Sequence, residues 1–148
     1  MFNKQTILAR ARWLSDCVIF DETDSTQREA KASGRANCLY LTNQQLATYG
    51  RFGRAYFASS EGGIYMSVCL RPQAAFDELP QYTLLAAAAV VSAIEKLTDK
   101  KPLIKWVNDI YLGDKKIVGI LTEATTRATG ESQIILGMGI NFAISEFP

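Results

Sequence analysis

Lys116 is the residue of this sequence whose surroundings point most directly to chemistry. It lies in an apolar hairpin formed by residues 105–111 and 115–123, three positions before Gly119. Burying an ionised lysine is costly, and a nearby glycine opens the backbone, so the pattern indicates that an anion meets this lysine. A carboxylate or a phosphate would satisfy it. The alternative is an ordinary solvated lysine of the hairpin.

The string Gly50-Arg51-Phe52-Gly53-Arg54 offers backbone amides and two guanidinium groups at an i, i+3 spacing. A flexible loop of this kind can close over phosphate groups, because both kinds of donor suit phosphate oxygens. A solvated turn with two arginines is the other interpretation. Since only Tyr49 and Phe52 provide apolar anchors, we expect the loop to be mobile without a ligand.

The elements that position these residues follow from apolar periodicity, caps and turns. We predict helices over residues 3–14, from a Thr26-x-x-Glu29 capping box to about Gly34, and over residues 80–97. Strands are predicted at residues 17–20, 38–43, 63–70, 104–106, 110–112, 116–124 and 133–142, with a loop at residues 47–54. Strands joined by tight turns, with the helices grouped at one side, predict one α+β domain with a mainly antiparallel sheet.

Charge and cysteine content narrow the classes of function. The 16 Lys and Arg residues against 15 Asp and Glu residues give a net charge of +1, so there is no general attraction to nucleic acid or acidic membranes. Cys17, Cys38 and Cys69 are far apart and form no CxxC pair, which predicts small buried thiols. Because the sequence has neither a signal-peptide pattern nor an apolar run of membrane-spanning length, we expect a cytoplasmic protein.

Four motifs, in this order, resemble those of the biotin protein ligase catalytic domain. Asp24-Ser25-Thr26-Gln27 resembles the family's Asp-Ser-Thr-Asn, and residues 45–54 resemble Gln-Thr-x-Gly-Arg-Gly-Arg-x-Gly-Arg. Residues 105–123 resemble Lys-Trp-Pro-Asn-Asp followed by Lys-(Leu/Ile)-x-Gly-Ile-Leu-x-Glu, and Gly137-Met138-Gly139-Ile140-Asn141 resembles Gly-x-Gly-Ile-Asn. Together these motifs span nearly the whole chain.

This resemblance implies the fold of biotin and lipoate ligase catalytic domains, which is similar to that of class II aminoacyl-tRNA synthetases. It also implies a two-step reaction. The biotin carboxylate attacks the α-phosphate of ATP to give biotinoyl-5'-AMP, and a lysine of a biotin carboxyl carrier protein then takes the biotin. ATP and biotin are the implied substrates, with Mg²⁺ as the metal ion, and the carrier would belong to acetyl-CoA carboxylase or pyruvate carboxylase.

The resemblance assigns catalytic roles to Lys116, Arg51 and Arg54. Lys116 would lie between the biotin carboxylate and the α-phosphate and offset the repulsion between these two anions. The two arginines would grip the phosphates and keep the reactive adenylate away from water.

The implied biotin-binding residues are Ser25, Thr26, Gln45, Lys116, Gly119 and Leu121. Ser25, Thr26 and Gln45 would hydrogen-bond the ureido ring, while Gly119 and Leu121 would offer backbone groups. Simple helix capping is the alternative for Ser25 and Thr26, and a strand bulge is the alternative for Gly119.

The implied nucleotide-binding residues are Arg51, Arg54, Tyr56, Asn108 and Asn141. Tyr56 would pack on the nucleotide, and Asn141 would contact adenine. Asp109 matches the family's carboxylate near the metal ion, and ATP chemistry usually runs on the magnesium complex.

The sequence departs from these motifs where Thr48-Tyr49 replaces Gly-Arg, Gln27 replaces asparagine and Val107 replaces proline. Loss of the arginine removes a charge-assisted contact near the biotin and phosphate sites, so we expect weaker retention of biotin or of its adenylate. Tyr49 offers a stacking ring in its place. The other two changes are milder, because Gln27 keeps an amide and Val107 keeps a strand former.

Measured against this family, the chain is expected to be a catalytic domain incomplete at its C-terminus, with neither a helix-turn-helix module nor the C-terminal β-barrel. We therefore expect no binding to DNA and no binding to membranes, while the formation of a homodimer remains an open alternative. Two other functions also remain open. Lipoate or octanoate ligases and transferases share the fold and would need a longer apolar acyl pocket, and a non-catalytic remnant would bind biotin without ATP-dependent chemistry.

Overall fold

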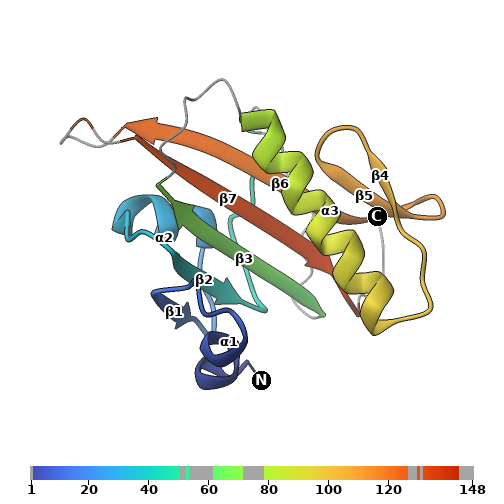
Figure 1. Cartoon of the computed structure of the whole chain (residues 1–148), viewed down its shortest axis with the longest axis horizontal. Coiled ribbons are helices and arrows are strands. Elements are labelled where there is room, and N and C mark those ends of the chain that lie inside the picture. The colour runs from blue at the N-terminus through green and yellow to red at the C-terminus, as the bar shows by residue number, and fades with distance from the viewer. Residues whose placement is uncertain are drawn as a thin grey trace.

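The computed structural model describes residues 2–50, 53, 62–71, 79–126, 130 and 132–143, which contain one seven-stranded sheet and three helices (Figure 1). The helices are α1 (Lys4–Arg10), α2 (Thr26–Ser33) and α3 (Leu79–Leu97). The strands are β1 (Asp16–Ile19), β2 (Cys38–Thr42), β3 (Gly63–Leu70), β4 (Leu103–Lys105), β5 (Asp109–Leu112), β6 (Lys115–Thr126) and β7 (Ser132–Asn141). Their order across the sheet is β1-β2-β3-β7-β6-β5-β4.

The sheet is mainly antiparallel, as predicted. Of the seven strands in the described ranges, only β1 and β2 run parallel to each other, and they are connected through α2. The other neighbouring strands are antiparallel, and β5 turns into β6 at Gly113, whose φ of 62° suits a residue without a side chain. Each predicted strand is present close to its expected bounds, so the α+β fold class is confirmed.

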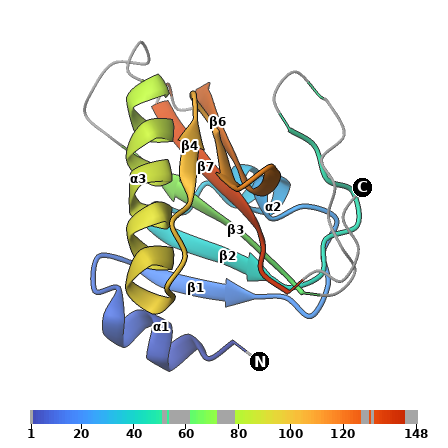
Figure 2. The ribbon, with the colours of Figure 1, turned by 90° about the vertical axis from the view of Figure 1, so that its right-hand side faces the viewer.

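Helices α2 and α3 pack on opposite faces of the sheet (Figure 2). Val68 of β3 packs in a core with Ala87 and Val90 of α3, whereas the next residue, Cys69, packs in a second core with Ala30 of α2. The prediction that the helices group at one side is therefore wrong. Because successive side chains of a strand point to opposite faces, a strand with apolar residues at both kinds of position needs cover on both faces.

The ends of the first two helices differ from those predicted. Helix α2 is capped by Ser25, whose Oγ accepts the backbone N–H of Arg28 at 3.4 Å, so the Thr26-x-x-Glu29 capping box is wrong by one residue. The helix ends as expected at Gly34, with φ 59°. Helix α1 ends at Arg10 rather than near residue 14, because it buries no residue and packing does not extend it.

The three cysteines are buried, with 1% or less of each residue exposed, and no disulfide joins them, which confirms the prediction of small buried thiols. Among the helices within the described ranges, none combines the length and apolar character needed to cross a membrane.

Candidate active site

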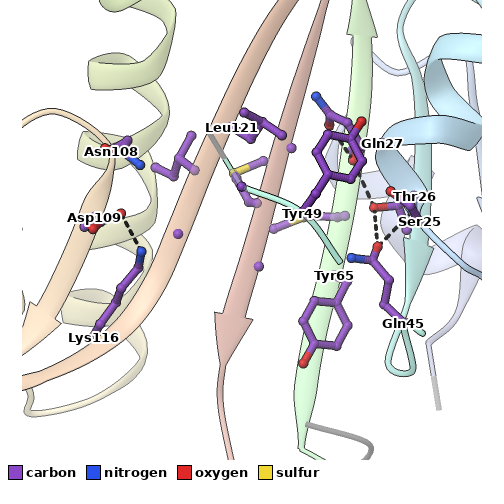
Figure 3. Close-up of a pocket in the computed structure, with 18 residues that line it drawn as sticks. Ser25, Thr26, Gln27, Gln45, Tyr49, Tyr65, Asn108, Asp109, Lys116 and Leu121 are labelled. Carbon is purple, nitrogen blue, oxygen red and sulfur yellow. Dashed lines mark hydrogen bonds and ion pairs between the residues drawn. The ribbon is translucent and has the colours of Figure 1, made fainter. Parts of the chain in front are cut away.

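A pocket of about 270 Å³ opens on the sheet face that carries α2, next to the first turn of that helix (Figure 3). Ser25, Thr26 and Gln27 line it from the start of α2, while Asn108, Asp109 and Lys116 line it from the β5–β6 side. This volume is slightly below the range of about 300–1,000 Å³ usual for ligand pockets. The described part of the pocket therefore suits one small compound better than a small compound together with a nucleotide.

The floor of the pocket consists of residues paired across the central strands. One row runs Tyr65, Gly139, Gly119 and Asp109, and the next runs Ser67, Gly137 and Leu121. Glycine occupies the middle of both rows, so a flat ligand would touch the backbone itself. The register irregularity between β5 and β6 falls between Ile110 and Tyr111, opposite a step from Val118 to Lys116, and Gly119 pairs regularly on both sides. A bulge at Gly119 is therefore excluded.

Hydroxyl and amide groups form one wall. The side-chain carbonyl of Gln45 accepts hydrogen bonds from the backbone N–H of Thr26 at 2.8 Å and from its hydroxyl at 3.1 Å. The Thr26 hydroxyl also lies 2.9 Å from that of Ser67. Ser25 and Thr26 are almost fully buried, and Figure 3 shows the amide nitrogen of Gln45 directed toward the pocket. Capping and pocket lining thus coexist at the start of α2, since Ser25 does both.

An ion pair forms the opposite wall. The Lys116 Nζ lies 2.8 Å from Asp109 Oδ1, and 34% of the lysine side chain is exposed. The lysine is neither fully buried nor an ordinary solvated residue, and the carboxylate that meets it here belongs to the chain itself. A cation and an anion side by side leave this wall without net charge, so a ligand anion would have to compete with Asp109 for the lysine.

Glu123 of β6 ties the pocket to α2 and to the segment before the arginine loop. Its Oε1 accepts from Lys31 Nζ at 2.8 Å, and its Oε2 accepts from Gln27 Nε2 at 3.0 Å and from the Tyr49 hydroxyl at 3.1 Å. The guanidinium of Arg28 lies over the Tyr49 ring, 5.4 Å from its centre. Three elements therefore meet at one carboxylate.

These contacts shift the pKa values of Glu123 and Tyr49. Burial by itself would raise the pKa of Glu123, but hydrogen bonds from Lys31, Gln27 and Tyr49 outweigh it and the pKa is lowered. Burial, followed by the negative charge of Glu123 and the hydrogen bond to it, raises the pKa of Tyr49 to about 12. At neutral pH the glutamate is therefore an ionised acceptor and the tyrosine a protonated donor.

The lowered pKa of Glu123 predicts how acid affects stability. Because the folded state favours the ionised form, the carboxylate stabilises the fold at neutral pH, and this contribution is lost as pH falls below the ordinary glutamate pKa of 4.5 and through the lowered folded value. Glu123→Gln should therefore reduce the melting temperature at pH 7, with a deficit that narrows steadily below pH 4.5. Thermal unfolding of both proteins at several pH values measures this, and a deficit independent of pH would contradict it.

Comparison with known proteins assigns the family. The model of the Biotin/lipoate A/B protein ligase family matches residues 19–141. The chain belongs to this family. It is 38% identical over 128 residues to the bifunctional ligase/repressor BirA of Bacillus subtilis, a match that covers 84% of this chain and 39% of that protein. It is also 32% identical over 126 residues to the biotin--[acetyl-CoA-carboxylase] ligase of Paracoccus denitrificans, covering 82% of this chain and 52% of that one.

Solved structures give the same assignment to the biotin/lipoate ligase family. The biotin protein ligase of Aquifex aeolicus in complex with biotin and ATP has a TM-score of 0.78 and 32% identity, over 91% of this chain and 56% of that one. A lipoate protein ligase from Thermoplasma acidophilum, with a TM-score of 0.58 and 12% identity, shares the fold alone. The chain spans between about two fifths and just over half of the length of these biotin-ligase relatives.

Most residues predicted from the family motifs meet in this pocket. Its lining contains Ser25, Thr26, Gln45, Asn108, Asp109, Lys116, Gly119 and Leu121. Asn141 is not among the lining residues, and its side-chain nitrogen donates to the backbone carbonyl of Lys116 at 3.3 Å. Arg51, Arg54 and Tyr56 lie outside the described residues, and so does most of the loop for which mobility is predicted.

Sequence reasoning missed several pocket residues of this family member. Tyr65 and Ser67 line the pocket from β3, and Gly137 and Gly139 line it from β7. Alternation was the available signal: Ser67 is a polar residue within an apolar strand, and two glycines at a spacing of two must lie on the same face.

The metal prediction rests on Asp109 alone. Within the described ranges, no group of three or more His, Cys, Asp or Glu side chains could hold a metal ion. Asp109 has Asn108 beside it in the pocket lining and Lys116 as its ion-pair partner. A single carboxylate is compatible with Mg²⁺, which is usually bound through one or two carboxylates together with substrate phosphates.

Proposed function

We propose that this chain carries the biotin-activating site of a biotin protein ligase, which forms biotinoyl-5'-AMP from biotin and ATP and transfers biotin to a lysine of a carrier protein. The observation that supports it best is the pair of opposite pocket walls, one of hydroxyl and amide groups and one carrying Lys116. Biotin has the matching asymmetry, because its neutral ring bears hydrogen-bonding groups and its tail ends in a carboxylate.

In this proposal the ureido ring lies against Ser25, Thr26 and Gln45. A neutral group with both donors and acceptors requires complementary polar partners inside a pocket, since an unmatched polar group there is costly. The hydrogen bonds between Thr26 and Gln45 hold these partners in place before a ligand arrives. Gly119 and Leu121 provide the backbone edge of the floor on which the ring rests.

Lys116 takes the biotin carboxylate in exchange for Asp109. The lysine then stabilises the approach of this carboxylate to the α-phosphate, where two anions must come together. A carboxylate oxygen attacks the α-phosphorus and pyrophosphate leaves. In the second step the amine of the carrier lysine attacks the acyl carbon and AMP leaves. The ion pair with Asp109 keeps the lysine positioned between turnovers.

The nucleotide would lie next to Asn108, which lines the described pocket, and extend from there toward Asn141. The Oδ1 atom of Asn141 is buried, has no hydrogen-bond partner among the residues that the structure describes and does not line the described pocket, so a contact with the adenine amino group would require this side chain to become exposed. The roles of Arg51, Arg54 and Tyr56 in phosphate and nucleotide binding rest on the family motifs. Asp109 would hold Mg²⁺ together with the nucleotide phosphates, and the ion would offset phosphate charge.

We further propose a biotin carboxyl carrier protein as the partner, because relatives are named as ligases of acetyl-CoA carboxylase. A cytoplasmic location, the lack of DNA or membrane binding, and homodimer formation remain predictions.

A lipoate or octanoate ligase is the second candidate, favoured by the fold shared with a lipoate protein ligase. The polar wall argues against it. The dithiolane ring of lipoate offers no hydrogen-bonding groups to Ser25, Thr26 and Gln45, and a polar wall that gains no hydrogen bond from a ligand discriminates against that ligand. Biotin binding without chemistry is the third possibility.

Biotin-dependent exchange of labelled pyrophosphate into ATP tests the proposal, because it isolates adenylate formation from carrier recognition. We expect exchange with biotin and none with lipoate. Exchange with lipoate would instead assign the chain the function of a lipoate ligase. No exchange, together with biotin binding measured by calorimetry, would leave a binding pocket without chemistry.

A further inference from the structure

The two departures from the family motifs that lie in the pocket meet at a single atom. Gln27 and Tyr49 both donate hydrogen bonds to Glu123 Oε2, at 3.0 Å and 3.1 Å. They come from different elements, one from α2 and one from the segment that follows Gln45. Two replaced side chains that share one acceptor suggest a joint role for all three residues.

Tyr49 holds the far end of the segment formed by residues 45–50. At its near end, backbone N–H groups of Leu46 and Ala47 donate to the carbonyls of Thr23 and Asp24 at 3.1 Å and 2.9 Å. At the far end, the Tyr49 hydroxyl reaches Glu123 on β6, and the ring packs beneath Arg28. This segment, the 45–50 wall, is therefore tied to α2 on one side and to the sheet on the other.

Gln27 links the same carboxylate to the floor of the pocket. Its amide nitrogen also donates to the carbonyl of Ile135 at 3.2 Å, and its carbonyl accepts from the Ser67 hydroxyl at 3.0 Å. Glu123 pairs with Ile135 across β6 and β7, one row beyond the row of Leu121 and Gly137. The Gln27 side chain is almost fully buried, so its position is fixed by these partners.

We propose that Glu123 is a positioning residue of the biotin site, which acts through Tyr49 to hold the 45–50 wall and through Gln27 to hold the floor. The inference rests on the proposed function. It assigns Tyr49 a neutral, aromatic role in which the hydroxyl binds the protein and the ring faces the pocket, in place of a charged contact with the ligand. Tyr49 is among the residues that line the pocket (Figure 3).

The test compares Tyr49→Phe, Glu123→Gln and their double variant with the wild-type chain in biotin-dependent pyrophosphate exchange. Tyr49→Phe keeps the ring and removes only the hydroxyl. We expect KM for biotin to rise roughly tenfold, the effect of losing one hydrogen bond to a charged group, while kcat at saturating biotin is unchanged. The free-energy loss calculated from KM should be smaller in the double variant than the sum of the losses in the two single variants, because the residues act together. Tyr82→Phe, on α3 at the opposite face, is the matched control.

Hydrogen–deuterium exchange of the ligand-free chain provides a readout that does not depend on activity. The peptide covering residues 44–50 should exchange faster in Tyr49→Phe than in the wild-type chain or in Tyr82→Phe. If the wild-type chain fails to exchange pyrophosphate, the proposed function is lost, but this measurement still decides whether the 45–50 wall is held. Unchanged amide exchange overturns the proposal even if KM rises, because the hydroxyl would then contact the ligand directly. Faster amide exchange with an unchanged KM also overturns it.

Discussion

Lys116→Ala is expected to abolish biotin-dependent pyrophosphate exchange, with a fall in kcat of about 10²–10³-fold or more, the range found when a single charge-stabilising donor is removed from an active site. The variant loses the cation that would lie between two reacting anions. It also leaves the Asp109 carboxylate without its 2.8 Å ion-pair partner, so the site gains uncompensated negative charge where anionic substrates must bind. Binding of biotin, measured by calorimetry, should weaken as well.

Lys115→Ala is the matched control. Lys115 is adjacent in sequence, carries the same charge and is exposed, and it does not line the pocket. Far-ultraviolet circular dichroism and thermal unfolding should show both variants folded, because the Lys116 side chain is itself partly exposed. Equal loss of activity in the two variants would indicate a general effect of charge. Full activity of Lys116→Ala would remove the lysine from the proposed chemistry.

Gly137→Ala should destabilise the fold and weaken biotin binding together. A Cβ atom at this position would overlap Gln27 Oε1 and would lie 3.1 Å from Gln27 Cδ and 3.2 Å from Ser67 Oγ. Because the Gln27 amide is held by Ser67, Ile135 and Glu123, its end cannot move away freely. Forcing extra volume into such a site costs about 1–3 kcal/mol. Chemical denaturation measures this loss of free energy of unfolding.

A second substitution separates this clash from other effects of a larger residue in β7. Gln27→Asn shortens the amide by one methylene and should relieve the overlap, so the double variant Gln27→Asn, Gly137→Ala should be more stable than the sum of the single effects predicts. Additive losses would show that Gln27 is not the residue displaced. Biotin binding should remain weak in the double variant, because the added methyl group still projects over the pocket floor.

Local pattern was sufficient for most of the secondary structure. The alternation and turn signals that predict the strands from residue 63 to residue 142 depend on neighbouring residues only, and the corresponding strands are present. The cap of α2 was misplaced, since Ser25 and Thr26 are both acceptable N-caps and backbone geometry chooses between them. The grouping of helices was wrong because the face on which a helix packs depends on how the chain crosses the sheet.

The candidate site was also predicted only in part from the sequence. The residue pattern of the hairpin pointed to Lys116, the resemblance to the family motifs pointed to Ser25, Thr26 and Gln45, and these residues line one pocket. Short motifs report them because each motif keeps its own residues close in the chain. Spacing could not pair Lys116 with Asp109, since this contact depends on the register of β5 against β6.

The sequence by itself determined the strands, the α+β class, the buried cysteines and the polar residues at the start of α2, because these depend on local propensity and on the balance of apolar and polar groups. Only the tertiary structure decided that glycines of β6 and β7 form one floor, and that Gln27 and Tyr49 meet at Glu123 over separations of 96 and 74 residues. Such contacts join segments far apart in the chain, and their partners are fixed by strand order and register, which no local pattern specifies.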